Sequence, residues 1–547
     1  MAESFLLLDS RDNVVVALAT LEPGALVRLG NGTSPVSCAA AETIPAKQKM
    51  ALADLKPGDL IFMYGMVVGE AVKPIARGGL LTTSNIRHRT GDYSAERRPA
   101  AIAPPDASAW TGRTFQGFRR ADGQVGTRNY WIVVPLVFCE NRNVEQLREA
   151  LEEELGYGRA NNRYRQYVRK LVHARSNHDG PEDGSPQARA KRIFPNLDGI
   201  RFLTHQLGCG GTRQDAQALC GLLAGYIHHP NVAGATVLSL GCQNAQAGLL
   251  MEELRARDPE LRKPVLIFEQ QKSGYETALI EQALDQSFAA LADADRIHRQ
   301  AVPLSALTIG LQCGGSDGFS GVSANPAVGF VSDLVVGAGG KTMLSEFPEL
   351  HGVEQELINR CATDELAARF SHLMQTYAAR ARAVQSDFAF NPSPGNIRDG
   401  LITDAIKSAG AARKGGVSQV SDVIDYPEYV AKPGLTLQCT PGNDVESVTA
   451  QVGAGCNIVL FTTGLGTPTG NPIAPVLKIS TNSKLAERMG DIIDFDAGGI
   501  VTGETTVAEC AEKLLELSIE VASGNRLTKA EERGQIDFIP WKRGVSL

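Results

Sequence analysis

The chain has 547 residues, a net charge of −7, and 43% hydrophobic but only 6% aromatic residues. A single hydrophobic core rarely grows beyond ~300 residues, so this length predicts two to four domains. The acidic balance argues against a nucleic-acid partner, and no apolar run approaches the roughly 20 residues that a membrane helix needs. Because no signal peptide pattern is present and the ten cysteines are scattered singly, we expect a cytoplasmic protein with reduced thiols and a small-molecule partner.

Residues 1–92 alternate short apolar runs with turn signals such as Pro23-Gly24 and Asn31-Gly32, which is typical of a small, mostly β domain. Residues 93–114 are polar and rich in proline, and this composition indicates a linker. We therefore expect residues 1–92 to fold independently and to move as a lid against the remainder of the chain.

From residue 115 onward, apolar strand-like runs alternate with amphipathic helical stretches, as in α/β proteins. The segment NPSPGN at 391–396 interrupts this pattern, so we predict one α/β domain over 115–390 and a second over 391–547. A polar insertion at 156–198 is expected to form a helix and a loop without a chemical role.

The glycine-rich stretch 310–329 follows the apolar run 304–311 and is costly to order, which indicates backbone that must approach something closely. A bound ligand is one interpretation, since Cys313 is a soft ligand or nucleophile, Asp317 a hard ligand or base, and Ser316 a hydroxyl donor. The other is a tight crossover between a strand and a helix.

Four cysteines, Cys139, Cys209, Cys242 and Cys313, each follow an apolar run at a predicted strand end. Parallel α/β sheets bind ligands outside the carboxyl ends of their strands. Three of these thiols together could hold iron or an iron–sulfur cluster; otherwise one is a reactive thiolate and the others pack in the core.

Further polar candidates lie in the same kind of loop. His205 precedes Cys209, and Glu346 and Glu349 offer two carboxylates that suit a hard divalent cation or a proton transfer. Lys407 and Lys414 flank small residues, as in a carboxylate-binding pocket, and surface lysines are the alternative interpretation. The loop at Thr463 supplies hydroxyls and glycines without a P-loop lysine, which argues against nucleotide binding.

With these segments in place, the chain resembles the altronate and galactarate dehydratase family of sugar-acid hydro-lyases along nearly its whole length. The motifs that carry the resemblance are GTRN (126–129), THQLGC (204–209), LGCQN (240–244), CGGSDGFSG (313–321), ANP (324–326), SEFPE (345–349), NPSPGN (391–396), PGND (441–444) and FTTGLGTP (461–468). The resemblance implies a β-clip SAF domain over 1–92, joined to a two-domain α/β body.

The resemblance also implies an activity, which is loss of water from an altronate-type aldonate or a hexarate to give a 2-keto-3-deoxy acid. A divalent metal, Fe²⁺ with Mn²⁺ or Mg²⁺ as alternatives, would stabilise the enediolate while a base removes the α-proton. Matching the motif positions gives catalytic candidates His205, Asp317, Glu346, Glu349 and Lys407; substrate-binding candidates Ser316, Asn391, Asn396, Asn443, Asp444 and Thr463; and metal-binding candidates Cys209, Cys242 and Cys313.

The chain departs from the family pattern where many relatives carry histidines in the small domain, since it has Gln48 and Leu80 there. Nearby His88 is a candidate to replace them. Leu465 and Gln243 also depart from the family pattern. A sulfo-lyase acting on sulfolactate and a non-catalytic sugar-acid binding protein are the alternative functions. The expected partners are the sugar acid and further copies of the chain.

Overall fold

The computed structural model describes residues 4–29, 36–99, 102–158, 164, 167, 168, 170–172 and 191–546. The chain forms two compact units. Unit 1 comprises 1–127, 221–231 and 299–543, and unit 2 comprises 128–220, 232–298 and 544–547. Most of the polar insertion predicted for 156–198 lies outside the described residues. Within the described ranges, no helix combines the length and the apolar composition needed to cross a membrane.

The small N-terminal domain of unit 1 is entirely β in its regular structure, as its turn spacing predicts. Three small antiparallel sheets have the orders β1-β2-β5, β3-β4 and β6-β7-β8. The strands are β1 Phe5–Leu6, β2 Val14–Ala17, β3 Leu26–Leu29, β4 Val36–Ala39, β5 Lys49–Ala51, β6 Leu60–Met63, β7 Met66–Ala71 and β8 Ile86–Arg87.

This domain shares part of its apolar core with the larger body of unit 1. One buried cluster around Val27 and Ile44 belongs to the small domain alone. Val14 and Ile61, however, lie in the same cluster as Leu344 and residues of the body helices. In the linker, the Arg97 guanidinium pairs with Asp364. Apolar contacts thus continue from the small domain into the body, and the independent folding of residues 1–92 stays a prediction.

The body of unit 1 is built on a seven-stranded parallel sheet with the order β18-β19-β17-β16-β20-β21-β22. Its central strands are apolar and fully buried, as expected for a sheet covered on both faces. The strands are β16 Thr308–Cys313, β17 Lys341–Leu344, β18 Val420–Ile424, β19 Gly434–Gln438, β20 Ile458–Thr463, β21 Val476–Ser480 and β22 Phe495–Asp496.

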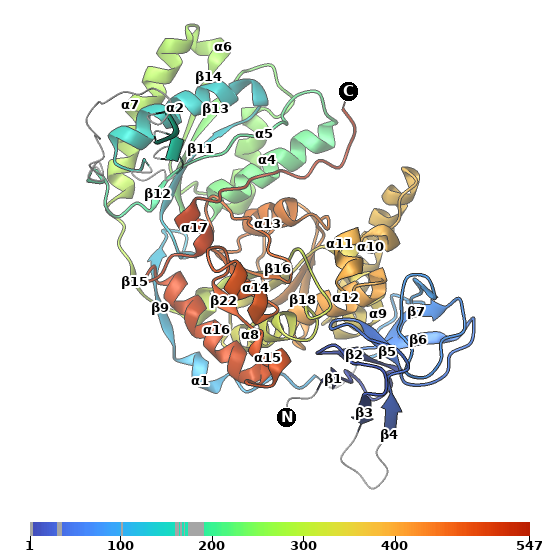
Figure 1. Ribbon diagram of the computed structural model, residues 1–547. Coiled ribbons are helices and arrows are strands. Elements are labelled where there is room, and N and C mark those ends of the chain that lie inside the picture. The colour runs from blue at the N-terminus through green and yellow to red at the C-terminus, as the bar shows by residue number, and fades with distance from the viewer. Residues whose placement is uncertain are drawn as a thin grey trace. The chain divides into compact units, whose positions relative to one another are not determined.

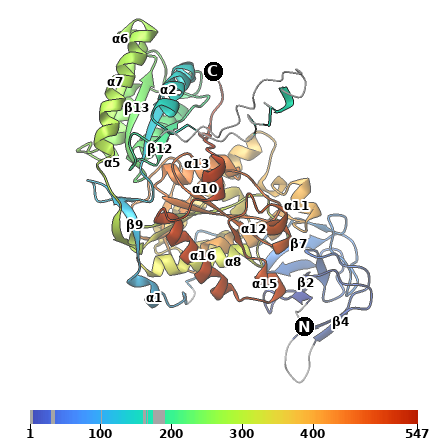
Figure 2. The ribbon, with the colours of Figure 1, turned by 60° about the vertical axis from the view of Figure 1, so that its left-hand side comes forward.

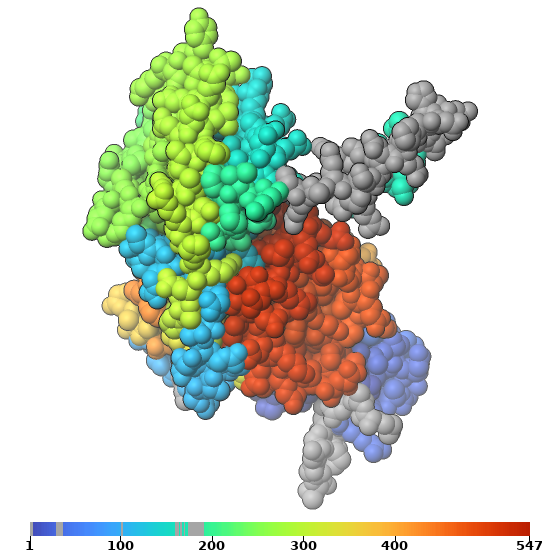
Figure 3. All heavy atoms as spheres, turned by 90° about the vertical axis from the view of Figure 1, so that its left-hand side faces the viewer, coloured from blue at the N-terminus to red at the C-terminus, as the bar shows by residue number. Residues whose placement is uncertain are grey.

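Helices cover this sheet, and α8 and α16 lie side by side against it (Figure 2). The C-terminal part of unit 1, orange to red, forms a continuous surface in the space-filling view (Figure 3). The helices are α8 Ala324–Gly337, α9 Glu354–Arg360, α10 Asp364–Ala383, α11 Pro394–Arg398, α12 Asp404–Ala412, α13 Asp444–Gly453, α14 Ser483–Arg488, α15 Gly499–Thr502, α16 Val507–Ala522 and α17 Lys529–Arg533.

The predicted domain boundary at residue 390 falls inside the seven-stranded sheet, since β16 and β17 precede it and the other five strands follow. The two predicted α/β domains therefore share one core over this region. A three-stranded antiparallel sheet, ordered β10-β9-β15, and the short helix α1 precede the body in unit 1. Their bounds are α1 Ser108–Thr111, β9 Thr114–Arg119, β10 Val125–Gly126 and β15 Gln300–Pro303.

Unit 2 contains a second parallel sheet, of four strands in the order β12-β11-β13-β14 (Figure 1). Its core includes Trp131, Leu147 and Phe268. The elements are β11 Tyr130–Pro135, α2 Asn141–Glu154, β12 Gly199–Phe202, β13 Val232–Ser239, α5 Ala247–Arg257, β14 Val265–Glu269, α6 Gln270–Ser273 and α7 Glu276–Ala294, and α4 Arg213–His228 continues into unit 1. The predicted α/β class with an N-terminal β domain is confirmed.

Candidate active site

The carboxyl edge of the seven-stranded sheet gathers most of the predicted site residues. Cys313 is the last residue of β16, Glu346 follows β17 directly beside it, and Thr463 ends β20 on the other side. Asp444 begins the helix that follows β19. Because the strands run parallel, these chain segments converge at one edge, which is where open α/β sheets bind ligands.

The glycines of the central loop are explained by how closely carboxylates pack on its backbone. A β-carbon at Gly314 would lie 2.2 Å from an oxygen of Asp444, and one at Gly464 would lie 2.2 Å from the carboxyl carbon of Asp317. Gly315 has φ +59°, which favours glycine. The loop is therefore a tight crossover and also the support of two acidic side chains.

Cys313, Glu346 and Glu349 form a buried centre at this edge. The Cys313 sulfur lies 3.4 Å from Glu349 Oε2 and 4.0 Å from Glu346 Oε2. Glu346 adopts φ 64° and ψ 61°, a left-handed conformation that costs of order 1–3 kcal/mol for a residue with a side chain. Its Oε1 is buried without a hydrogen-bond partner. Strain and an unpaired oxygen at one residue mark it as a functional candidate.

Two buried lysines complete this centre. Lys414 Nζ donates to Cys313 Sγ at 2.7 Å and lies 3.5 Å from Glu346 Oε2. Lys407 Nζ lies 2.7 Å from Glu349 Oε1 and donates to Asn391 Oδ1 at 2.6 Å. The sequence predicts Lys407 as a site residue, whereas Lys414, on the turn after α12, is not among the predicted site residues.

The two glutamates experience opposite electrostatic effects. Burial, together with the charge of Glu349, raises the pKa of Glu346 well above its ordinary value. Burial also disfavours ionisation of Glu349, but the ammonium groups of Lys407 and Lys414 outweigh it and lower the pKa of that carboxyl. Burial raises the pKa of Cys313 to about 12, although Lys414 opposes this. These shifts favour the ionised form of Glu349 and the neutral forms of Glu346 and Cys313.

Asp317 anchors a second part of the site, to which the small domain contributes. Its Oδ2 lies 2.9 Å from Lys47 Nζ and accepts a hydrogen bond from Thr481 at 3.1 Å. Lys47 also contacts Asp399 at 3.0 Å and adopts φ 75°. The carbonyl of Lys47 is so close to Gly318 and Gly400 that a β-carbon at either would clash with it. The turn at Lys47 is therefore seated against the central loop.

Most predicted substrate-binding residues lie at this edge, but several have structural contacts. Asn443 caps α13, and Asn396 takes part in the capping box of α11 while donating to the Ser316 carbonyl at 2.7 Å. The Thr463 hydroxyl accepts from Gly466 N at 2.9 Å. Asn391 binds Lys407. Burial and the Glu349 charge raise the pKa of Asp444 to about 6.

His205, Cys209 and Cys242 belong to unit 2. His205 is buried, its Nε2 lies 2.8 Å from the Pro135 carbonyl, and its Nδ1 accepts from Leu207 N at 3.1 Å. Burial lowers its pKa to about 4, so it is neutral. Both ring nitrogens bind its own scaffold, which favours a structural role. Cys209 and Cys242 are exposed at loops after β12 and β13, and their metal role stays a prediction.

The resemblance implies a divalent metal, and the centre around Cys313 offers candidate ligands for it. One ligand atom from each of Cys313, Glu346 and Glu349 lies within 4.8 Å of the others. Lys414 and Lys407, however, already contact all three side chains. A dication there would have to compete with two buried ammonium groups for the same lone pairs. In this arrangement the centre does not fit a divalent ion.

Sequence reasoning also missed Lys49 and Lys478. Lys49 is fully buried near Asp317 and donates to the Lys47 carbonyl at 2.9 Å, and its burial lowers its pKa to about 7. Lys478 stands alone in the buried strand β21, where burial lowers its pKa to about 8. A single lysine inside an apolar strand is a detectable sequence signal for Lys478.

Three family models match successive parts of the chain. They are the altronate/galactarate dehydratase SAF domain over 3–89, the second domain of D-galactarate dehydratase/altronate hydrolase over 117–295, and the C-terminal domain of D-galactarate/altronate dehydratase over 304–546. The C-terminal match, over 304–546, contains all seven strands of the parallel sheet. It therefore agrees with a single domain there and not with a division at residue 390.

Similar proteins cover nearly the whole chain. It is 33% identical to altronate dehydratase of Bacillus subtilis (strain 168) over 546 residues, which is 100% of both chains. It is 33% identical to altronate dehydratase of Escherichia coli (strain K12) over 99% of this chain and 100% of the relative. Galactarate dehydratase (L-threo-forming) of Escherichia coli is 31% identical, over 90% of this chain and 88% of the relative.

Proposed function

The chain belongs to the altronate/galactarate dehydratase family, and from that membership we propose that it removes water from an aldonic or aldaric acid to give a 2-keto-3-deoxy acid. As a member of this family the chain is a lyase that dehydrates a sugar acid. The proposed reaction and product are supported by the pair of glutamates at the carboxyl edge of the sheet, whose pKa values shift in opposite directions.

Elimination of water needs a base for the α-proton and an acid for the departing β-hydroxyl. Glu349, kept ionised by Lys407, is the proposed base. Glu346, kept protonated by burial, is the proposed acid, and its unpartnered Oε1 is free to meet the leaving oxygen. The C–H electron pair forms the new double bond as the C–O bond breaks. The resulting enol then tautomerises to the 2-keto-3-deoxy acid.

The lysines supply the positive charge that an anionic substrate and its enediolate need. Lys414 and Lys407 contact the centre directly, and Lys47 contacts Asp317 next to it. Burial strengthens each charge interaction. We therefore propose that the substrate carboxylate binds to these ammonium groups. The asparagine and hydroxyl side chains around them suit the sugar hydroxyls.

Substrate entry requires a local movement. Cys313, Glu346, Glu349 and Lys414 are each less than 5% exposed. The turn that carries Lys47 lies against the central loop, and its side chain is still 20% exposed. We therefore propose that this turn, rather than the whole small domain, moves to admit the substrate and returns to exclude water.

The test is a substrate panel of hexonates and hexarates, with sulfolactate included, in which keto acid and sulfite are both measured. Run in D₂O, the proposed reaction places deuterium at C3 of the product, because the enol is protonated from solvent. Glu349→Gln and Glu346→Gln should each lose at least about 100-fold in turnover, whereas the exposed control Glu365→Gln should not. Ligand-induced stabilisation without turnover would favour a binding protein, and sulfite release would favour the sulfo-lyase.

A further inference from the structure

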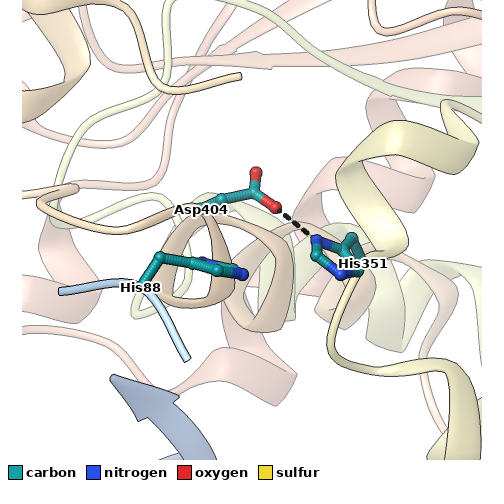
Figure 4. A group of neighbouring side chains, drawn as sticks. All are labelled: His88, His351 and Asp404. Atoms are coloured by element: carbon teal, nitrogen blue, oxygen red, sulfur yellow. Dashed lines mark hydrogen bonds and ion pairs between the residues drawn. The ribbon is translucent and has the colours of Figure 1, made fainter. Parts of the chain in front are cut away.

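A second group of polar side chains lies near the first, where the small domain meets the body of unit 1. His88 follows β8, His351 follows the 3₁₀ turn Phe347–Leu350, and Asp404 is the first residue of α12. Figure 4 shows the two imidazoles and the carboxylate turned toward a common space. One ligand atom from each lies within 4.8 Å of the other two. Segments far apart in the sequence thus bring two nitrogen ligands and one oxygen ligand together.

Contacts within the protein leave much of this group unsatisfied. His351 Nδ1 lies 3.1 Å from Asp404 Oδ2, and the His88 and His351 rings stack with centroids 5.1 Å apart. His88 Nδ1 and Asp404 Oδ1 are buried without hydrogen-bond partners, and the Asp404 side chain is fully buried. A buried carboxylate oxygen without a partner is destabilising, so such atoms in a native protein call for an explanation.

The charges around this group favour a cation. No ammonium or guanidinium group is hydrogen-bonded to the three side chains in the part of the chain that the structure describes, in contrast to the Cys313 centre. Lys407, one turn along α12, acts electrostatically on Asp404, but its ammonium contacts Glu349 and Asn391. Glu354 and Asp387 act electrostatically on His351. They also line a cavity of about 120 Å³ that His351 borders, and Arg382, which lines it too, lies 3.5 Å from Asp387.

We propose that His88, His351 and Asp404 bind one divalent first-row transition ion, such as Fe²⁺ or Zn²⁺. Two imidazoles and one carboxylate are the ligand set of open-sided sites for such ions, whereas Mg²⁺ prefers oxygen ligands alone. Such a set leaves coordination positions open, and the adjoining cavity has room for water or for ligand oxygens in them. His88 therefore contributes a ligand from the small domain.

The position of this site also relates it to the Cys313 centre. His351 lies two residues after Glu349, and Asp404 lies three residues before Lys407 on α12. An ion held there would lie close to the ion pair that keeps Glu349 charged. The binding site depends only on its own geometry, while any use of the ion in catalysis rests on the proposed function.

The experiment measures metal binding directly, without substrate. The full chain is stripped with chelator, loaded anaerobically with Fe²⁺, and assayed for metal content; Co²⁺ loading adds a visible absorption spectrum that reports ligand geometry. We expect one ion per chain. His88→Ala and Asp404→Asn should weaken binding by more than about 100-fold, because even residues behind the ligands change metal affinity by 10–100-fold. His372→Ala, at an exposed histidine of α10, should bind like the wild type.

One further variant separates ligation from a structural role. His88→Cys keeps a metal-binding atom, so the Co²⁺ form should gain a thiolate charge-transfer band in the near ultraviolet, which only direct coordination produces. Melting curves of the metal-free variants establish that each is folded. The proposal is overturned if the wild type binds no ion, if His88→Ala and Asp404→Asn bind as tightly as the wild type, or if folded His88→Cys shows no such band. Metal binding without turnover would count against the proposed function alone.

Discussion

Replacing each glutamate of the Cys313 centre by glutamine tests whether they differ in protonation. The Glu349 and Lys407 side chains are 5% and 10% exposed and lie 2.7 Å apart. Glu349→Gln leaves the ammonium buried without its anion, a change that typically costs 3–5 kcal/mol. Because Lys407 keeps its bond to Asn391, we expect the lower end, about 3 kcal/mol, or a fall in Tm of about 4 °C for a unit of this size.

Glu346→Gln should behave differently. If burial keeps Glu346 protonated, glutamine replaces a neutral group of similar shape, and the free energy of unfolding at neutral pH should change by less than about 1 kcal/mol. Turnover should still fall strongly in both variants, because one loses the base and the other the acid.

The assay combines thermal melts with keto-acid formation for both variants, the double variant Glu349→Gln/Lys407→Met, and the exposed control Glu365→Gln. The double variant should recover most of the lost stability, since it removes both charges. Equal destabilisation by Glu346→Gln and Glu349→Gln would refute the assignment of one acid and one base. Full turnover in either single variant would remove that residue from the mechanism.

Three further predictions concern stability. Burial raises the pKa of Glu346 in the folded state. The contribution of Glu346 to the free energy of unfolding is therefore fully present below its unfolded pKa and is lost as pH rises through its folded pKa. Thermal melts at increasing pH should show the wild type losing stability relative to Glu346→Gln. Gly314→Ala places a methyl group 2.2 Å from an Asp444 oxygen and should lose at least ~1 kcal/mol and most turnover, unlike Gly112→Ala, where nothing lies within 4 Å. Deleting residues 1–92 should expose the shared core and yield a poorly soluble body, which sedimentation of the purified fragment would reveal.

Sequence patterns predicted the placement of polar side chains at the sheet edge because that placement is local. Cys313 does end a buried strand, and Glu346 and Glu349 do follow the next one. A strand followed by glycine, cysteine or acidic residues places those side chains at the carboxyl edge in any parallel sheet. The fold class and the small β domain follow from the same local alternation and turn signals.

The failures arose where the answer depends on contacts between distant segments. The boundary at residue 390 looked plausible because NPSPGN breaks regular structure, but α11 begins within it and the sheet continues on both sides. His205 has the sequence context of a site residue, yet its two nitrogens bind Pro135 and Leu207. Local sequence does not reveal which hydrogen bonds a buried imidazole makes.

The small domain contributes side chains to the candidate site. Lys47 reaches Asp317, Lys49 is buried beside it, and His88 faces His351 and Asp404. Gln48 itself donates to the Arg398 carbonyl at 3.1 Å. This hydrogen bond stabilises the turn that carries Lys47 and Lys49. Where the resemblance predicts a histidine, this chain has Gln48, and the same domain presents a histidine from another strand end and cations from either side of Gln48. Only its contacts with the body reveal this arrangement.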